Sequence, residues 1–399
     1  MAVIGSAAAI GRRRGRLAGR TQLRIININT EKTWRGGESQ TFNLMRGLRA
    51  GGHDVSAAVM PGGALARRCR DEGIPILELS MRSDADVPAA WRLAGQARSA
   101  RCDILHAQTA RAHAIGLLAR LCGAPGRLVV HRRLDFPIAR NPLDRLKYRS
   151  RRVDAWIAVA EVVRGVLIAG GVEPGRISVI NSSIDLGRFT GVPDQRRAVR
   201  AELGIPQDAW LVGNVAALAW HKGQKDLLAA MPHLLKRVPS AWLVMVGGGE
   251  ERTALEALAR ALGVESRVIF TGVRQDVPRL LTALDAFCMS SLLEGLCNSV
   301  LEAFAMQVPV VATRAGGLPE LVEDGRTGLL VPPRDAQALA EALSRQHDDP
   351  AAARRMAGAA RDLVHARFGV DYMVARTAEL YARLLRTQAT LPPGNIPRT

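Results

Sequence analysis

The sequence predicts an α/β protein built from two doubly wound domains that face each other across a cleft. Short apolar, β-branched runs alternate with amphipathic segments of helix length, first over residues 23–180 and again over residues 211–331. Each gap between the runs is long enough for a crossover helix, as parallel sheets require. The 399 residues also leave room for two domains, each with its own core.

The strands are placed by these apolar runs. In the first series we expect strands at residues 23–29, 55–60, 76–79, 103–106, 128–131, 155–158 and 177–180. In the second series we expect them at residues 211–215, 242–246, 268–271, 286–289, 310–313 and 329–331. Residues 334–388 are alanine-rich and predicted to be helical, up to a Pro-Pro-Gly breaker at residues 392–394.

The domain boundaries follow from changes in composition. Residues 184–208 combine glycine, proline and mixed charges, which predicts an interdomain linker with at most one short helix. We therefore divide the chain into segments, namely a disordered basic arm (1–21), an N-terminal domain (22–183), the linker (184–208), a C-terminal domain (209–365) and a C-terminal helix (366–390). Packing of that last helix back on the N-terminal domain is one option.

Composition excludes several classes of protein. Hydrophobic residues make up 48% of the chain and charged residues 23%, which excludes wholesale disorder and a fibrous protein. The longest apolar run, Trp210–Trp220, is too short to span a bilayer. The five cysteines are odd in number and have no metal-ligand spacing, so we expect neither a disulfide framework nor a zinc ribbon. A soluble protein of the reducing cytoplasm is the expectation.

The net charge of +18 is concentrated in two segments. Residues 1–20 carry five arginines and no acidic residue, and residues 127–152 carry nine basic residues against two acidic ones. Such clustering favours an anionic partner at a defined surface, either nucleic acid or acidic lipid.

The most informative stretch, SSLLEGLCNSVLEAFA, follows the expected strand at residues 286–289. Its two glutamates, Glu294 and Glu302, are eight positions apart, with Glu302 about one turn inside a helix expected to begin near Asn298. Gly295 and the small Ser299 leave the amides at the start of that helix open, and such amides bind phosphate groups. A carboxylate on each side suits a sugar, a diphosphate and a ribose in a row, although two solvated glutamates at a helix start are the simpler interpretation of the pair alone.

Further motifs occur in a fixed order around this stretch. They are Asn181-Ser182-Ser183-Ile184-Asp185 with Phe189, Trp220-His221-Lys222-Gly223, Phe270-Thr271-Gly272-Val273, the valine-rich strand 309–313 and Gly316-Gly317-Leu318-Pro319-Glu320. Together with the paired glutamates they resemble a family 4 glycosyltransferase over about residues 22–385. The resemblance implies the GT-B fold of two Rossmann-like domains and a retaining glycosyl transfer.

The resemblance also implies roles for individual residues. Glu294 would contact hydroxyls of the donor sugar, Glu302 the nucleotide ribose, and Lys222 the leaving diphosphate. Donor-binding positions would include Val273, Asn298 and Ser299. The sequence departs from the family pattern at one point. The family usually has an arginine five or six residues before the lysine, and here Ala217 and Ala216 occupy these positions. Lys225, Arg274 or an arginine of the first domain are candidate substitutes.

In the first domain, Gly36 and Gly37 lie between the first strand and a helix expected near Ser39. Two glycines permit close backbone approach to a diphosphate, although an ordinary turn explains them equally well. By resemblance they form the donor-side glycine loop. His131, at a strand end, would touch the donor sugar and is our catalytic histidine, whereas His106 would shape the site.

No cofactor and no metal are expected. Asp84-Ala85-Asp86 has the D-x-D form of metal-dependent glycosyltransferases, but it precedes an amphipathic helix and is interpreted as a helix cap or first-turn acid pair.

Arg145, Arg149 and Arg152 have helical spacing within the basic segment and predict one cationic face on an interfacial helix, with a solvated face as the alternative. We assign these arginines to the acceptor or an anionic membrane surface. No nucleic-acid partner is expected, because no recognised nucleic-acid module is present.

The sequence thus predicts a metal-independent enzyme that moves a hexosyl group from a nucleotide-diphosphate sugar to a lipid-linked or cell-envelope glycan, such as lipopolysaccharide or exopolysaccharide, at the inner membrane. Two alternatives stay open: another GT-B enzyme such as a nucleotide-sugar 2-epimerase, and a non-catalytic lipid- or nucleic-acid-binding protein on the same scaffold.

Overall fold

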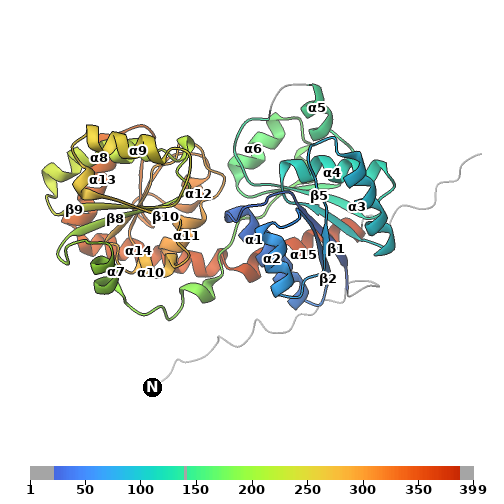
Figure 1. Ribbon diagram of the computed structural model, residues 1–399, viewed down its shortest axis with the longest axis horizontal. Helices are drawn as coiled ribbons and strands as arrows, with labels where there is room; N and C mark the ends of the chain where they lie inside the picture. Colours follow the sequence, from blue (N-terminus) through green and yellow to red (C-terminus); the bar gives the residue numbers. More distant parts are fainter. Residues whose placement is uncertain (1–21, 139–141, 387–399) are drawn as a thin grey trace, which may run out of the picture.

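The computed structural model describes residues 22–138 and 142–386, which form two lobes side by side (Figure 1). The first lobe contains a parallel sheet in the order β3-β2-β1-β4-β5-β6-β7. Its strands are β1 (Arg24–Asn29), β2 (Asp54–Val59), β3 (Ile76–Glu78), β4 (Ile104–Ala107), β5 (Arg127–Arg132), β6 (Ala155–Ala158) and β7 (Ile177–Val179).

The second lobe contains a parallel sheet in the order β10-β9-β8-β11-β12-β13. Its strands are β8 (Trp210–Val215), β9 (Ala241–Val246), β10 (Val268–Gly272), β11 (Ala286–Met289), β12 (Val310–Thr313) and β13 (Leu329–Val331). Every predicted strand is present in the structure to within about two residues. The prediction of two doubly wound α/β domains is confirmed.

Helices cover both faces of each sheet, because strands buried on both faces need apolar cover on both sides. In the first lobe these helices are α1 (Gly36–Ala50), α2 (Ala64–Asp71), α3 (Val87–Ser99), α4 (Ala110–Leu121), α5 (Pro142–Tyr148) and α6 (Glu161–Ala169). In the second they are α7 (Arg196–Glu202), α8 (Gln224–Arg237), α9 (Arg252–Ala261), α10 (Val277–Leu281), α11 (Asn298–Ala305), α12 (Leu318–Leu321), α13 (Ala336–Asp348) and α14 (Pro350–Arg367). Short 3-10 turns lie at η1 (Pro174–Arg176), η2 (Leu186–Phe189), η3 (Trp220–Lys222) and η4 (Glu265–Arg267).

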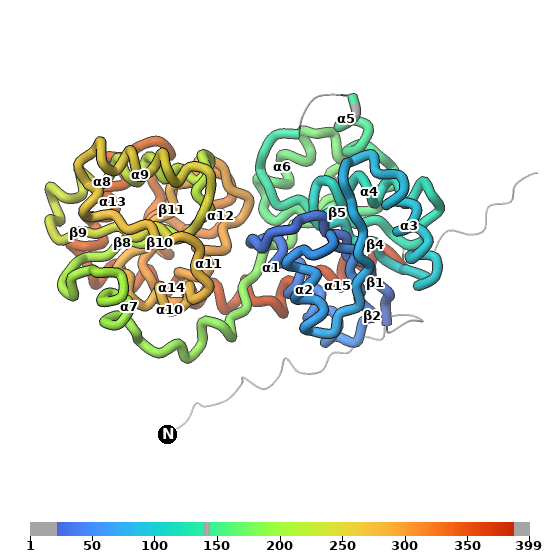
Figure 2. Tube along the Cα trace, in the orientation of Figure 1, coloured from blue at the N-terminus to red at the C-terminus, as the bar shows by residue number. Residues whose placement is uncertain are grey.

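The chain crosses between the lobes twice, and the two crossings lie side by side. The amide of Ile184 donates to the carbonyl of Phe368 at 2.9 Å, and Ile184 forms an isolated β-bridge with Gly369. After this point the last helix, α15 (Val370–Arg386), runs back under the first lobe, as the tube trace makes clear (Figure 2). Its Met373, Leu380 and Tyr381 are buried in the same cluster as α1 residues of that lobe.

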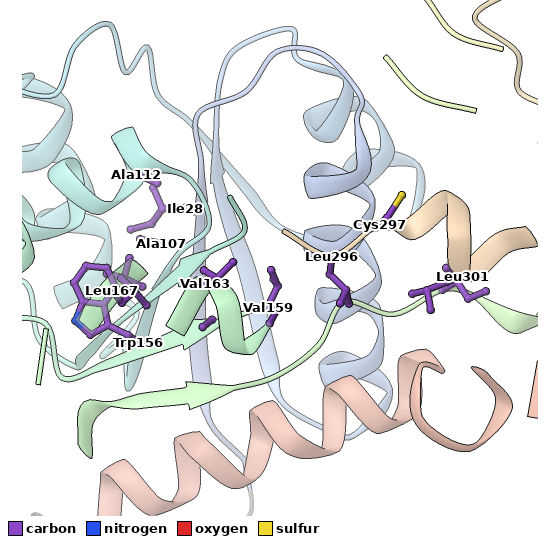
Figure 3. Packing of buried hydrophobic residues seen from close by; sticks show 14 of the residues in the cluster. Ile28, Ala107, Ala112, Trp156, Val159, Val163, Leu167, Leu296, Cys297 and Leu301 are labelled. Atoms are coloured by element: carbon purple, nitrogen blue, oxygen red, sulfur yellow. The ribbon is translucent and has the colours of Figure 1, made fainter. Parts of the chain in front are cut away.

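A hydrophobic cluster is shared by the two lobes. Val159 and Val163 of the first lobe belong to the same buried cluster as Leu296, Cys297 and Leu301 of the second (Figure 3). The lobes therefore pack against each other through apolar side chains beside the predicted site, and not only through the linker.

The segment predicted as a linker, residues 184–208, is more than a connection. Its second half forms α7, in which Val199 and Arg200 are completely buried. The Arg200 guanidinium donates to the Asp285 carboxylate at 2.8 Å and to the carbonyls of Ala283 and Ala209. The side chain of Arg200 is therefore satisfied entirely inside the second lobe.

Other expectations on individual segments have different outcomes. The basic arm, residues 1–21, lies outside the described residues. The helix cap predicted at residues 84–86 is confirmed for Asp86, whose carboxylate accepts a hydrogen bond from the amide of Ala89 at the start of α3. Asp84 instead forms an ion pair with Lys147 at 2.9 Å. No helix within residues 22–138 and 142–386 is long and apolar enough to cross a membrane.

The burial of Arg200 yields a stability prediction. Arg200→Leu should lower the free energy of unfolding by about 1 to 3 kcal/mol, because it leaves the buried carbonyls of Ala209 and Ala283 without this donor, whereas Asp285 keeps Arg196 and the amide of Leu211. Chemical denaturation measures the loss, and Arg197→Leu on the exposed side of α7 is the matched control. A loss under about 1 kcal/mol for the Arg200 variant would contradict this account.

Candidate active site

The start of α11 is the centre of the site, and its amides have no side-chain cap. Asp86, Thr109, Asp335 and Asp349 cap α3, α4, α13 and α14, whereas at α11 the N-cap residue is Cys297 and no acidic residue lies in the first turn. The amides of an uncapped helix start, together with the helix dipole, favour an anion.

A half-buried ion pair lies next to this helix start. The Nζ atom of Lys222 is 2.5 Å from Oε2 of Glu294, and Ser291 Oγ donates to the same oxygen at 3.3 Å. Burial alone would lower the pKa of Lys222, but the Glu294 carboxylate outweighs it, so the pKa lies above its ordinary value. Lys222 is therefore a fixed positive charge beside the helix start.

Glu302 lies in α11 and is half-buried. Among the residues that the structure describes, its carboxylate has no hydrogen-bond or ion-pair partner. Burial raises the pKa of Glu302 to about 7, with Arg188 acting in the opposite direction. An acceptor that is half-desolvated and without a donor suits a ligand hydroxyl.

The glycine turn of the first lobe approaches α11 directly. Gly36 and Gly37 are the first residues of α1, and a Cβ atom on Gly36 would lie 3.1 Å from Nδ2 of Asn298. Asn298 has a buried Oδ1 without a partner, and Ser299 Oγ lies 3.3 Å from Cys297 Sγ. The structure therefore brings Gly36, Asn298 and Ser299 to one place from two lobes.

Val273 lies apart from this group, just after β10, and is 73% exposed. A Cβ atom on Gly248 would lie 3.1 Å from its Cγ2, so Val273 stands beside the glycine turn that follows β9. Its side chain contributes no polar contact, and any role in binding falls to its exposed apolar surface or its backbone.

His131 is the next-to-last residue of β5 and is buried against His106, with ring centroids 5.6 Å apart and planes nearly parallel. Arg133 donates to its Nδ1 at 3.3 Å. Because a guanidinium only donates, Nδ1 must accept, which leaves the imidazole proton on Nε2. Burial, followed by the charge of Arg133, holds the pKa of His131 well below its ordinary value, so the ring is neutral and its unpartnered Nε2–H is a donor.

Two residues of this site were missed by the sequence reasoning, and both come from the first-lobe segment after β5. The Asp135 carboxylate accepts a hydrogen bond from the amide of Glu294 at 3.0 Å, across the lobes. Arg133 donates to the carbonyl of Gln108 at 2.6 Å and to the hydroxyl of Thr41 at 3.4 Å. The only signal was Asp135 itself, one of two acidic residues in a basic segment.

The geometry also reduces the number of residues that could substitute for the arginine missing at positions 216 and 217. Lys225 is paired with Glu251 at 2.7 Å, and Arg274 is held by Glu202 and Asp276, each at 2.8 Å. Arg133 is the first-lobe arginine that reaches the site, with its Cδ 3.8 Å from a Cβ atom on Gly37. Burial lowers the pKa of Arg133 to about 10, which still leaves it charged.

The three membrane or acceptor arginines do not form the predicted face. α5 ends at Tyr148, because this side chain is buried in a stack with Trp156 at 5.2 Å and the chain turns there. Arg145 and Arg149 remain one turn apart, whereas Arg152 lies beyond the helix in a separate turn. The prediction of one helical face is wrong for Arg152.

Comparison with known proteins gives the family. Residues 34–188 match the model of Glycosyltransferase Family 4, and residues 195–363 match that of Glycosyl transferases group 1. The chain belongs to the family 4 glycosyltransferases.

Among relatives of this family 4 chain is the GDP-mannose-dependent alpha-(1-6)-phosphatidylinositol monomannoside mannosyltransferase of Mycolicibacterium smegmatis. It is 34% identical over 56% of this chain and 60% of the relative. The lipopolysaccharide core biosynthesis glycosyltransferase LpsE of Rhizobium meliloti is also 34% identical, over 49% of this chain and 57% of the relative. The matches thus span somewhat more than half the length of these relatives.

Solved structures agree with the GT-B fold. The HepE protein of Anabaena, solved in complex with UDP and glucose, has a TM-score of 0.80 at 24% identity and covers 90% of this chain and 100% of its own. A glycosyltransferase of Rickettsia africae has a TM-score of 0.82 at 21% identity and covers 92% of this chain and 100% of its own.

The raised pKa of Glu302 predicts how stability depends on pH. The folded chain, with a pKa of about 7 against an ordinary 4.5, binds this proton more tightly than the unfolded chain does, so stability falls as pH rises from 4.5 to 7. Glu302→Gln should remove this loss of stability. Its free energy of unfolding should exceed that of the parent by about 3 kcal/mol at pH 8, but by little at pH 4.5. Denaturation at both pH values tests it, with the exposed Glu265→Gln as control; an equal difference at both would contradict the assignment.

Proposed function

We propose that this chain is a retaining glycosyltransferase that moves a sugar from a nucleotide-diphosphate donor to an acceptor hydroxyl. The observation that carries the proposal is the uncapped start of α11, flanked by the Lys222–Glu294 pair and by the unpartnered Glu302 carboxylate. Glu294 before the helix, the helix start itself and Glu302 inside the helix match a sugar, a diphosphate and a ribose in a row.

In this mechanism the diphosphate lies at the start of α11, where Lys222 and the helix amides stabilise the negative charge that develops as the sugar leaves. The Glu302 carboxylate accepts hydrogen bonds from the ribose hydroxyls. The Glu294 carboxylate, already held by Lys222, accepts from hydroxyls of the donor sugar.

From the first lobe, the neutral Nε2–H of His131 donates to an oxygen of the donor sugar. The bond from the anomeric carbon to the diphosphate breaks as the acceptor oxygen approaches from the same face. The departing phosphate takes the proton of the acceptor hydroxyl, so no protein nucleophile is required. Arg133 positions His131 and takes over part of the charge that Ala216 and Ala217 do not supply.

The donor class and the acceptor class are supported by the relatives. One is named for a GDP-mannose donor and a phosphatidylinositol mannoside acceptor, another for lipopolysaccharide core synthesis, and the solved HepE structure contains UDP. We propose a hexose donor and a lipid-linked or envelope glycan acceptor, with the protein bound peripherally to the inner face of the cytoplasmic membrane. The basic residues around α5 are the membrane-facing candidates.

Substitutions of the two glutamates should affect different quantities, nucleotide binding for Glu302 and turnover for Glu294. Glu302→Ala should weaken binding of the matching nucleoside diphosphate by about 1 to 3 kcal/mol, because it removes the acceptor for the ribose hydroxyls. Glu294→Gln keeps a hydrogen-bond partner for Lys222 and should leave that binding within about threefold of the parent, while turnover falls by at least about a hundredfold.

Calorimetry with UDP, GDP and ADP, followed by assay of nucleoside diphosphate released from the corresponding sugar donors, tests both statements. Equal losses of binding and turnover in the two variants would contradict the division of roles. Binding without release of nucleoside diphosphate in the parent would favour the non-catalytic alternative.

We also propose that the transfer needs no metal ion. Asp84 is paired with Lys147 at 2.9 Å and Asp86 caps α3, so the D-x-D pair is engaged locally. Activity should therefore survive excess EDTA, and Asp84→Ala should leave turnover within about twofold of the parent, because its role is a surface ion pair. Complete loss in chelator that magnesium or manganese restores would overturn this proposal.

A further inference from the structure

A groove opens in the first lobe between α5 and α6, next to the site but outside it. It has a volume of about 590 Å³, within the range of small-molecule sites. Its floor is one face of α6, formed by Val162, Gly165, Val166 and Ala169 at spacings of three and four residues, and Ile138 borders it. A groove with an apolar floor of this kind accommodates a hydrocarbon chain.

Two cations line the same groove. Arg145 of α5 and Arg149, which follows that helix, both border it and are exposed. Among the residues that the structure describes, neither guanidinium has an ion-pair partner. The Nε atom of Arg149 packs over Gly171, where a side chain would collide with it. Two uncompensated guanidinium groups beside an apolar floor complement a ligand that carries a phosphate on a hydrocarbon chain.

The residues that border the groove follow the site residues directly in the sequence. Asp135 contacts the amide of Glu294, and the ring of Phe136 lies 5.7 Å from that of His221 in the second lobe. Pro137 and Ile138, the next two residues, already border the groove. One end of the groove therefore lies next to the residues that contact the second lobe.

We propose that this groove binds the phosphate and the first part of the hydrocarbon chain of a lipid-linked acceptor. The inference rests on the proposed glycosyl transfer and specifies its acceptor. The chain lies along the α6 face, the phosphate lies between Arg145 and Arg149, and the sugar end points along residues 135–137 toward the donor. The exposed Leu146, at 73%, extends the apolar surface outside the groove toward the membrane.

Decyl phosphate, below its micelle concentration, is a suitable probe. Calorimetry should show that it binds the full chain at least tenfold more tightly than decyl glucoside or inorganic phosphate. Gly165→Leu fills the groove, because a Cβ atom at that position meets no other atom within 4 Å, and it should weaken binding of decyl phosphate at least tenfold. Gly358→Leu, on the open side of α14, is the matched control with equal room and should bind like the parent.

A second pair of variants tests the charge. Arg145→Gln with Arg149→Gln should remove the preference for decyl phosphate over decyl glucoside, whereas Arg354→Gln with Arg355→Gln, exposed on α14, should keep it. Equal affinity for decyl phosphate in Gly165→Leu and the parent would overturn the proposal, as would inorganic phosphate binding as tightly as decyl phosphate.

The same titrations distinguish failure of this inference from failure of the proposed function. All four variants should bind nucleoside diphosphate as the parent does, because the donor site lies on α11. If the parent binds no nucleoside diphosphate but its binding of decyl phosphate depends on Gly165, the glycosyl transfer fails and the groove assignment stands. If it binds nucleotide but not decyl phosphate, the groove assignment alone fails.

Discussion

The hydrogen bond between the Asp135 carboxylate and the amide of Glu294 is the contact on which the geometry of the site depends, because it joins the two lobes at the residue assigned to the donor sugar. It requires very close backbone approach. A Cβ atom on Gly295 would overlap the carbonyl oxygen of Arg133, and one on Gly317 would overlap the carbonyl oxygen of Gly295. Glycine is thus needed at position 295 for contact between the lobes, and at position 317 for the close approach of two backbone segments within the second lobe.

Other contacts between the lobes hold the same closed arrangement. Glu320, at the start of α12, accepts hydrogen bonds from the amides of Glu161 and Val162 at 2.7 and 2.9 Å, and so caps α6 from the opposite lobe. Without Glu320, the backbone amides in the first turn of α6 would donate to water. Because α6 also forms the floor of the groove, closure of the lobes is coupled to the position of both the donor helix and the acceptor surface.

The strands and the donor helix could be predicted from sequence because their signals are local. A run such as Ala286–Met289 is buried on both faces, and the helix starting at Asn298 follows it directly. The partners of the site could not be predicted in this way. In the sequence Asp135 is one acidic residue in a basic loop. Its contact with Glu294 forms only when the two folded domains pack against each other. The same holds for Tyr381, whose hydroxyl lies 2.7 Å from Nδ1 of His106, 275 residues away in the chain.

The basic segment shows why charge counted along a sequence overstates charge at a surface. Arg127 is paired with Asp154 at 2.7 Å, Lys147 with Asp84, and Arg132 donates to the Tyr148 hydroxyl, so these cations serve the fold. Arg133 donates to His131, Gln108 and Thr41 and faces the proposed donor site, so it is not available to a partner outside the protein. What remains for an external anion is a smaller set around α5, and two of that set line the apolar groove. Among the described residues, the positive charge of this segment is therefore divided between contacts within the fold and exposed arginines around α5, and Arg145 and Arg149 are the two for which we propose a ligand.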